Sequence, residues 1–410
     1  MSHWTRCTGN SMYKENVIYF STDNMDEFID KNFSEYINLI KTITAIPAPY
    51  KKEEKRAEFV SAFLKDMGFE PVTDSENNVI LSLCRDWERG CSVCKKYRDC
   101  NRERHVYMAH LDTVFSDENI QVTETEDGKL TGPGVGDDTT NVAALLFAVK
   151  YIKEKKICIK DNLNVLVCFD TGEEGLGNLR GCRKLMESYD NITQVIAFDL
   201  GYDKVNNVAV GSKRYKITVK TSGGHSYNDF GSDNAIKLMA DIIELLYGID
   251  TVKMPGKTTY NVGLINGGTS VNTIASEASV LYEFRSDSKE GLDMMEKEFM
   301  QIIERLKRDY NIEVEKTGDR PSMGRPDRDK MRELTEKSVA LIENVCGIKP
   351  QVGSLSTDCN IPLSMGIPSI CYGAYLGGGA HTKNEYVETD SLKKGLKIVI
   401  NSLISDCNIV

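Results

Sequence analysis

The sequence predicts an α/β protein in which a mixed, mostly parallel sheet carries an inserted α+β unit. Between residues 79 and 199, apolar segments of strand length alternate with segments of helical periodicity, which is typical of βαβ units. The strand segments are almost entirely apolar, as expected for strands that are buried on both faces. Near Lys213 the pattern changes to several strands with two helices, and after Asp319 it returns to alternating helix and strand.

Composition and charge narrow the class of protein. The chain has 410 residues and a formal net charge of -10, which argues against nucleic-acid or anionic-membrane partners. No stretch approaches the ~18 apolar residues that span a bilayer, and the polar N-terminus lacks the apolar segment of a secretory signal. Several of the 12 cysteines lie in apolar runs, as Cys168 does, which favours reduced thiols. We therefore expect a cytoplasmic protein that binds neither nucleic acid nor membrane.

The length suggests two or three domains, because single cores stop growing at ~250–300 residues, and the expected elements divide the chain into two. Helices are predicted at 25–44, 53–67, 140–152, after Asn178, and at 234–247, 292–308, 331–345 and 392–403. Strands are predicted at 79–83, 106–110, 163–169, 195–199, 215–221, 260–265, 279–284, shortly before 316, and at 369–372. The first domain then comprises residues 1–212 and 319–410, with a Cys-rich insertion at 84–104, and the inserted domain comprises 213–318.

His110 begins the segment His-Leu-Asp-Thr-Val at the end of an expected strand. A neutral imidazole is a zinc ligand, and Asp112 could accept the hydrogen bond of its other nitrogen and fix the tautomer. On its own, this pattern is more typical of a structural histidine.

A glycine-rich segment at 132–138 ends in Asp137 and Asp138 and precedes a helix. It differs from a dinucleotide fingerprint, because no apolar strand leads into it and its two acids would repel a phosphate. Negative charge at this place suits a cation. Capping of the helix by one of the two acids explains the segment equally well.

Two further acidic segments follow apolar strands, where functional sites of α/β sheets assemble. One contains Glu173 and Glu174, of which one could bind a metal while the other acts as general base. The other is Asp199. A pair of solvated loop acids is the common alternative for Glu-Glu, but several such motifs in one chain favour a metal site.

Taken together, these motifs resemble those of the dinuclear zinc exopeptidases and deacylases. This family includes peptidase T, bacterial dipeptidases, carboxypeptidase G, aminoacylase and succinyl-diaminopimelate desuccinylase. The order His-x-Asp, Gly-x-Gly-x-x-Asp, Glu-Glu, Asp and a late histidine, His381 in Ala-His-Thr-Lys-Asn-Glu, is similar from about residue 46 to about 403. The resemblance implies a zinc-peptidase catalytic domain with an inserted ferredoxin-like lid and dimerisation domain.

The resemblance also implies roles for individual residues. Asp137 would bridge two zinc ions, or cobalt or manganese in their place, and would be joined to Asp138 by a cis peptide. His110 and Asp199 would complete one metal site. Glu174 and His381 would complete the other. The remaining expected roles are orientation of His110 by Asp112 and general-base catalysis by Glu173.

The inserted domain carries two motifs that match the family's lid. His225, in Gly-Gly-His-Ser, would polarise the scissile carbonyl, in this family often from the partner subunit of a homodimer. Asn272 and Arg285 would bind a substrate carboxylate, the arginine through its planar fork. A lid-surface histidine and a strand-end salt bridge are the alternatives for His225 and Arg285.

The polar segment from residue 84 to 100 departs from the family. It contains four cysteines with spacings that suit a third, structural zinc ion: Cys84, Cys91, Cys94 and Cys100. An exposed insertion with free thiols is the alternative.

The expected function is hydrolysis of an amide bond in short peptides by a zinc-bridged hydroxide, with Glu173 as general base. An N-acyl amino acid deacylase with the same metals is the first alternative. A noncatalytic dimeric binding protein is the second, although the intact ligand set and general base argue against it.

Overall fold

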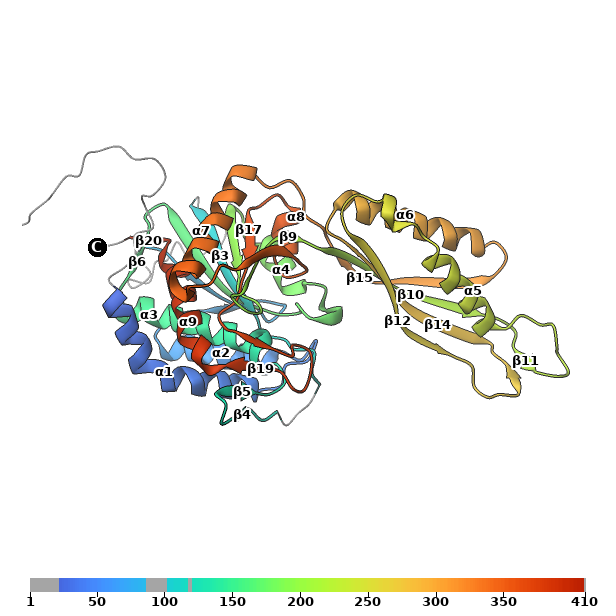
Figure 1. The fold of residues 1–410 in the computed structure, drawn as a ribbon, viewed down its shortest axis with the longest axis horizontal. Coiled ribbons are helices and arrows are strands. Elements are labelled where there is room, and N and C mark those ends of the chain that lie inside the picture. Colours follow the sequence, from blue (N-terminus) through green and yellow to red (C-terminus); the bar gives the residue numbers. More distant parts are fainter. Residues whose placement is uncertain (1–21, 86–101, 117–119, 409–410) are drawn as a thin grey trace, which may run out of the picture.

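The computed structural model describes residues 22–85, 102–116 and 120–408 (Figure 1). It consists of a larger unit with a central sheet between helices and an elongated unit that projects from one side. The elongated unit is formed by the middle of the chain, and segments on both sides of it in the sequence build the larger unit.

The larger unit is built on an eight-stranded sheet with the order β1-β2-β7-β3-β8-β17-β9-β16. These strands are β1 Val72–Thr73, β2 Val79–Leu83, β3 Glu103–His110, β7 Leu163–Asp170, β8 Ile192–Ala197, β9 Lys204–Ala209, β16 Gln351–Leu355 and β17 Ser369–Cys371. Four of the pairs, β7–β3, β3–β8, β8–β17 and β9–β16, are parallel. The pairs β1–β2, β2–β7 and β17–β9 are antiparallel. The predicted mixed, mostly parallel sheet is confirmed.

Helices cover both faces of this sheet. They are α1 Thr22–Thr44, α2 Glu54–Asp66, α3 Asn141–Lys155, α4 Arg180–Ser188, α7 Arg328–Cys346, α8 Asn360–Ser364 and α9 Thr389–Ile404. Successive strand side chains point to opposite faces, so Tyr107 lies in the core with α1, α3 and α9, whereas Met108 lies in the core with α4 and α8. Two apolar layers, one on each face, thus hold the strands of this sheet in place.

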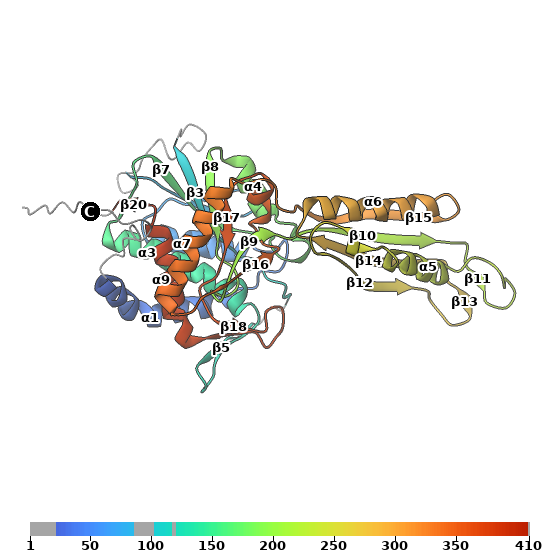
Figure 2. The same cartoon turned by 45° about the horizontal axis from the view of Figure 1, so that its top comes forward.

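The elongated unit is a second sheet with the order β12-β14-β10-β15 and two helices on one face (Figure 2). Its elements are β10 Gly211–Lys220, α5 Ala235–Tyr247, β12 Thr258–Gly267, β14 Glu277–Ser286, α6 Lys289–Leu306 and β15 Asn311–Arg320. Alternating residues of β10 and β14, such as Ile217 and Tyr282, face the helices in a core of their own. The strands begin and end two residues outside the expected range of 213–318.

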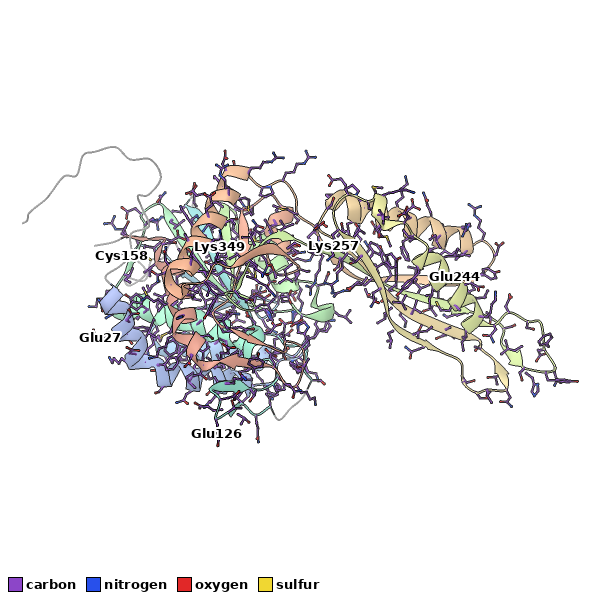
Figure 3. All side chains as sticks on the ribbon, viewed as in Figure 1. Glu27, Glu126, Cys158, Glu244, Lys257 and Lys349 are labelled. Carbon is purple, nitrogen blue, oxygen red and sulfur yellow. The ribbon has the colours of Figure 1, made fainter. Side chains whose placement is uncertain are left out.

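Short strands complete the fold. They are β4 Thr123–Glu124, β5 Lys129–Thr131, β6 Cys158–Ile159, β11 Gly224–His225, β13 Thr273–Ile274, β18 Gly377–Gly378, β19 Tyr386–Glu388 and β20 Cys407–Asn408. Charged residues such as Glu27, Glu126 and Lys349 lie exposed at the surface (Figure 3). In the part of the chain that the structure describes, no helix is long and apolar enough to cross a membrane.

Some expectations about local structure were wrong. The edge strand β16 and its neighbour β9 were missed, because β9 is partly polar and β16 is exposed along most of its length. Strand β3 begins at Glu103, so the end of the expected insertion belongs to the sheet.

Arg56 of α2 is fully buried beside the site and holds three chain segments together. Its Nε donates to the carbonyl oxygen of Ile46 at 2.7 Å, and a terminal nitrogen donates to that of Leu111 at 2.9 Å. Burial lowers the pKa of Arg56 to about 10, while Asp112, Asp138 and Glu385 raise it.

We expect Arg56→Met to lower the free energy of unfolding by about 2–5 kcal/mol, because it leaves buried carbonyl groups unpaired. Urea unfolding of the metal-free protein measures this change. Lys55→Met, an exposed neighbour on the same helix, is the control. Equal effects of the two substitutions would contradict the assigned role of Arg56.

Candidate metal centre

The site lies at the carboxyl edge of the parallel strands, where their last residues meet. His110 is the last residue of β3, and its backbone N–H donates to Asp138 Oδ2 at 2.9 Å. Asp199 follows β8 by two residues, and Glu173 and Glu174 lie in the segment after β7. His110 is 1% exposed and the three acids are also buried. The strand order therefore gathers these side chains from distant parts of the sequence.

Asp137 is held in place by a loop that Glu385 organises. The Glu385 carboxylate accepts hydrogen bonds from the backbone N–H groups of Gly134, Gly136 and Asp137 at 2.7, 2.8 and 2.7 Å. Burial raises the pKa of Glu385 to about 7, although these hydrogen bonds lower it. The peptide bond between Asp137 and Asp138 is cis, as the family resemblance implied.

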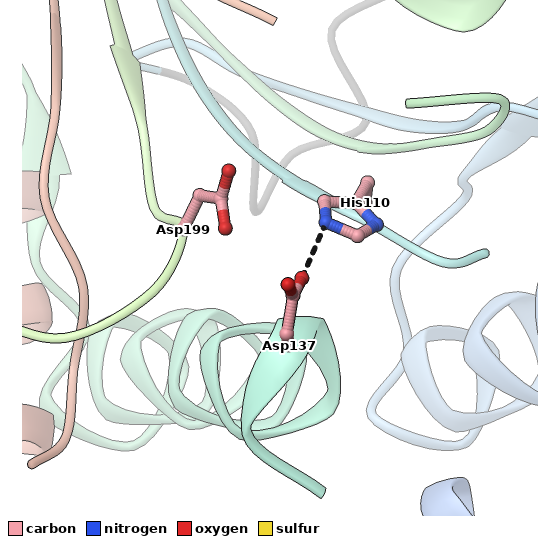
Figure 4. Close-up of side chains that lie close together, drawn as sticks. All are labelled: His110, Asp137 and Asp199. Atoms are coloured by element: carbon pink, nitrogen blue, oxygen red, sulfur yellow. Dashed lines mark hydrogen bonds and ion pairs between the residues drawn. The ribbon is translucent and has the colours of Figure 1, made fainter. Parts of the chain in front are cut away.

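Asp137 lies between the two histidines. Its Oδ1 is 3.1 Å from His110 Nε2, and its Oδ2 is 3.2 Å from His381 Nε2 (Figure 4 shows the first contact and the nearby Asp199). His381 Nε2 is also 2.9 Å from Glu174 Oε1. The structure thus brings together all five expected metal ligands.

Three groups of possible ligand atoms, each within 4.8 Å, occur among the described residues. They are His110, Asp137 and Asp199; Asp137, Glu174 and His381; and His110, Glu173 and Glu174. The first two groups share Asp137 and match the two predicted sites. The third group contains Glu173, so the distances between possible ligand atoms do not by themselves exclude Glu173 as a metal ligand.

The electrostatics of the cluster suit divalent cations. Burial alone would lower the pKa of His110, yet Asp138, Asp137 and Asp112 raise it well above its ordinary value. Hydrogen bonds to Asp137 and Glu174 raise the pKa of His381 to about 11. Asp199 Oδ1 is buried without a hydrogen-bond partner in the described structure. Nitrogen and oxygen donors in a strongly negative environment are the ligands that zinc, cobalt or manganese accept.

Asp112 has a different main contact from the one expected. Its carboxylate is 3.7 Å from His110 Nδ1, whereas its backbone oxygen is 3.1 Å from that nitrogen. The carboxylate instead accepts the backbone N–H groups of Glu173 and Glu174, at 3.1 and 2.8 Å. The Asp112 side chain therefore orients the Glu-Glu segment, and its main chain orients the histidine.

Glu173 pairs with an arginine that the sequence did not reveal. Its Oε1 is 3.0 Å from a terminal nitrogen of Arg320, the last residue of β15, and both side chains are buried. Burial raises the pKa of Glu173, whereas Arg320 lowers it. Arg320 escaped prediction because it belongs to no motif with a recognisable spacing. Glu385 ends the quoted segment around His381, but nothing in that segment indicates its contact with residues 134–137.

The expected lid residues do not join this cluster within the chain. His225 lies exposed in β11, and Asn272 is exposed in the neighbouring turn. Arg285 forms an ion pair with Glu283 on the same strand, and its Nε lies 2.8 Å from Glu283 Oε1. The geometry at Arg285 therefore matches the strand-end salt bridge.

The expected structural zinc site falls largely outside the described residues. Cys91, Cys94 and Cys100 lie there, whereas Cys84 directly follows β2 and is buried. The segment from residue 84 to 100 was expected to be too polar to bury its cysteines, and the burial of Cys84 contradicts this for its first residue. The third zinc ion stays a prediction.

His381 is 56% exposed, whereas the other four expected ligands are buried. Such a set of histidine and carboxylate ligands at this edge is typical of metal-dependent hydrolases. The model of Peptidase family M20/M25/M40 matches residues 106–404, and the chain belongs to this family. The predicted family is thereby confirmed, and with it a metal-dependent peptidase or amidohydrolase activity.

Relatives and solved structures agree with this assignment. A succinyl-diaminopimelate desuccinylase from Nitrosospira multiformis is 26% identical over 300 residues, 68% of this chain and 76% of the relative. Carboxypeptidase G2 from Pseudomonas sp. (strain RS-16) is 23% identical over 402 residues, 95% of this chain and 92% of the relative. A tripeptidase structure from Staphylococcus aureus is similar in fold, with 19% identity, a TM-score of 0.69, and coverage of 90% and 98% of the two chains.

Glu385→Ala should weaken metal binding by about 10- to 100-fold, because Asp137 would lose the anchor of its loop. Competition with a fluorescent chelator measures the affinity. Glu388→Ala, an exposed position nearby, should bind metal like the wild type. Unchanged affinity in Glu385→Ala would show that the loop keeps its shape without this carboxylate.

Proposed function

We propose that the chain is a dinuclear zinc exopeptidase that cleaves an amide bond of short peptides. The observation that carries this proposal is the position of Asp137 between His110 and His381. Asp199 completes one group of ligands and Glu174 the other. When bound there, zinc supplies Lewis acidity toward a water molecule and an amide carbonyl.

Glu173 is the proposed proton acceptor. It lies beside Glu174, and its carboxylate is oriented by the ion pair with Arg320. A carboxylate in this position can take a proton from the attacking water and return it to the leaving nitrogen. Glu173 is itself only 6% exposed, which limits its contact with bulk water.

Similarity supports two substrate classes. The structural similarity to a tripeptidase and the sequence similarity to carboxypeptidase G2 favour short peptides. The sequence similarity to a desuccinylase favours the second candidate, an N-acyl amino acid deacylase. A screen of tripeptides, dipeptides and N-acyl amino acids with zinc- or cobalt-loaded protein, followed by mass spectrometry, separates them. Turnover of N-acyl amino acids alone would contradict the peptidase proposal, and no turnover of any class would favour a binding protein.

A homodimer formed through the elongated unit is part of the proposal. The edge strand β12 exposes Leu264 and Ile265, and the adjacent α5 exposes Ile236. An open apolar strand edge favours pairing with a second copy. Such a contact could bring the partner's His225 to the metal centre, where it would stabilise the charge on the carbonyl oxygen.

Glu173→Gln should lower kcat by at least ~10²-fold with both metals retained, because it removes the general base. Glu174→Ala should instead lose metal. Steady-state kinetics and elemental analysis of the same preparations test this division of roles. Unchanged activity in Glu173→Gln would refute the assignment.

Mixing His225→Ala with Glu173→Gln subunits should restore activity, because the heterodimer contains one site with both groups intact. Recovery to roughly a quarter to a half of the wild-type rate per heterodimer is expected if the sites act independently. Native mass spectrometry verifies subunit exchange. Verified exchange without recovery would show that His225 does not act across the dimer.

A further inference from the structure

The segment 173–178 lies where the elongated unit joins the larger one. The chain enters the elongated unit through β10 and leaves it through β15 (Figure 1). Residues of both strands form hydrogen bonds with this segment. Arg214 of β10 donates a hydrogen bond to the backbone oxygen of Gly175. The backbone N–H of Asp319 in β15 donates to Asn178 Oδ1 at 2.7 Å.

Arg320, the next residue of β15, contacts Glu173 directly. One terminal nitrogen lies 3.0 Å from Glu173 Oε1 and 3.2 Å from Ser356 Oγ, and the other donates to the backbone oxygen of Glu173. The Arg320 and Glu173 side chains are only 6% and 7% exposed. A buried ion pair with two additional hydrogen bonds fixes the direction of both side chains, because each alternative orientation leaves a charge unpaired.

The segment has limited support of its own. Gly172 and Gly175 have φ angles of 73° and 52°, in the left-handed region that favours glycine. Asp112 anchors the two backbone N–H groups of Glu173 and Glu174, but it leaves the Glu173 carboxylate free to turn. Among the described residues, the hydrogen bond to that carboxylate comes from Arg320.

We propose that Arg320 is a positioning residue that orients Glu173 and links its orientation to the position of the elongated unit. The proposal rests on the proposed role of Glu173 as proton acceptor. Arg320 belongs to the sheet of the elongated unit through its pairing with Ser212. A displacement of β15 therefore moves the guanidinium group, and the Glu173 carboxylate moves with it.

Arg320→Met should lower kcat by about 10- to 100-fold with metal content retained and KM changed less than about threefold, because a misplaced base slows the reaction without altering substrate contacts. Arg320→Lys, which keeps the charge, should recover part of kcat. Arg325→Met, an exposed arginine five residues later, should behave like the wild type.

A double-mutant cycle identifies the group through which Arg320 acts. If it acts through Glu173, Arg320→Met should cause little further loss in Glu173→Gln. An equal loss in both backgrounds, or a rise in KM with unchanged kcat, would show that Arg320 contacts the substrate and would overturn the proposal.

Hydrogen–deuterium exchange of the metal-free protein tests the contact without activity. Backbone N–H groups in 173–178 should exchange faster in Arg320→Met than in Arg325→Met, while the core strands β3 and β7 exchange equally. Equal exchange in 173–178 would overturn the proposal even if the activity changed. A wild-type kcat in Glu173→Gln would instead refute the role of Glu173 as general base. The hydrogen-exchange result would still show whether Arg320 holds the segment 173–178 in place.

Discussion

Negative charge is buried at high density at the carboxyl edge of the eight-stranded sheet, and much of the neighbouring structure counteracts its self-repulsion. Among the residues that the structure describes, eight buried acids lie there: Asp112, Asp137, Asp138, Asp170, Glu173, Glu174, Asp199 and Asp358. Unpaired carboxylates are costly in a medium of low dielectric constant. Within the cluster, backbone N–H groups donate hydrogen bonds to the Asp112 carboxylate and stabilise its charge. Beside the cluster, backbone N–H groups stabilise the Glu385 carboxylate in the same way. Arg56 and Arg320 supply buried positive charge, and bound metal ions would supply the rest.

Not every acid in the cluster is available to a metal ion. Burial raises the pKa of Asp170 to about 8, and that of Asp358 also lies well above its ordinary value. Both oxygens of Asp170 and one of Asp358 lack a hydrogen-bond donor in the described structure. Near neutral pH, Asp170 is therefore largely protonated. Protonation of Asp170 removes repulsion within the cluster, while, against the effect of burial, the two histidines lower the pKa of Asp137 below its ordinary value. Burial raises the pKa of Asp199 well above its ordinary value, and a bound cation would favour its ionised form.

The ligand set was predicted through the resemblance of the combined motifs to the zinc-peptidase family, because each motif alone also fits a structural role. The strands of the core were predicted from the residues themselves, since buried parallel strands are long apolar runs. Arg56, Arg320 and Glu385 could not be predicted in this way. Their partners are distant in the sequence, and nothing in the local pattern distinguishes Arg320 from the exposed Arg325. Such contacts depend on the three-dimensional path of the chain.

Residues of the site are held in place by two different parts of the structure, the larger unit and the end of β15. The proposed ligands His110 and Asp199 depend on strand ends of the larger unit, and Asp137 depends on a loop that Glu385 holds within that same unit. Glu173 has its backbone anchored by Asp112 in the larger unit and its carboxylate anchored by Arg320 at the end of β15. A rigid support suits metal ligands, whose distances must not change, whereas a proton acceptor must be in place only when substrate is bound. Anchoring the proposed acceptor to the strand that joins the two units would make its orientation depend on how the units sit together.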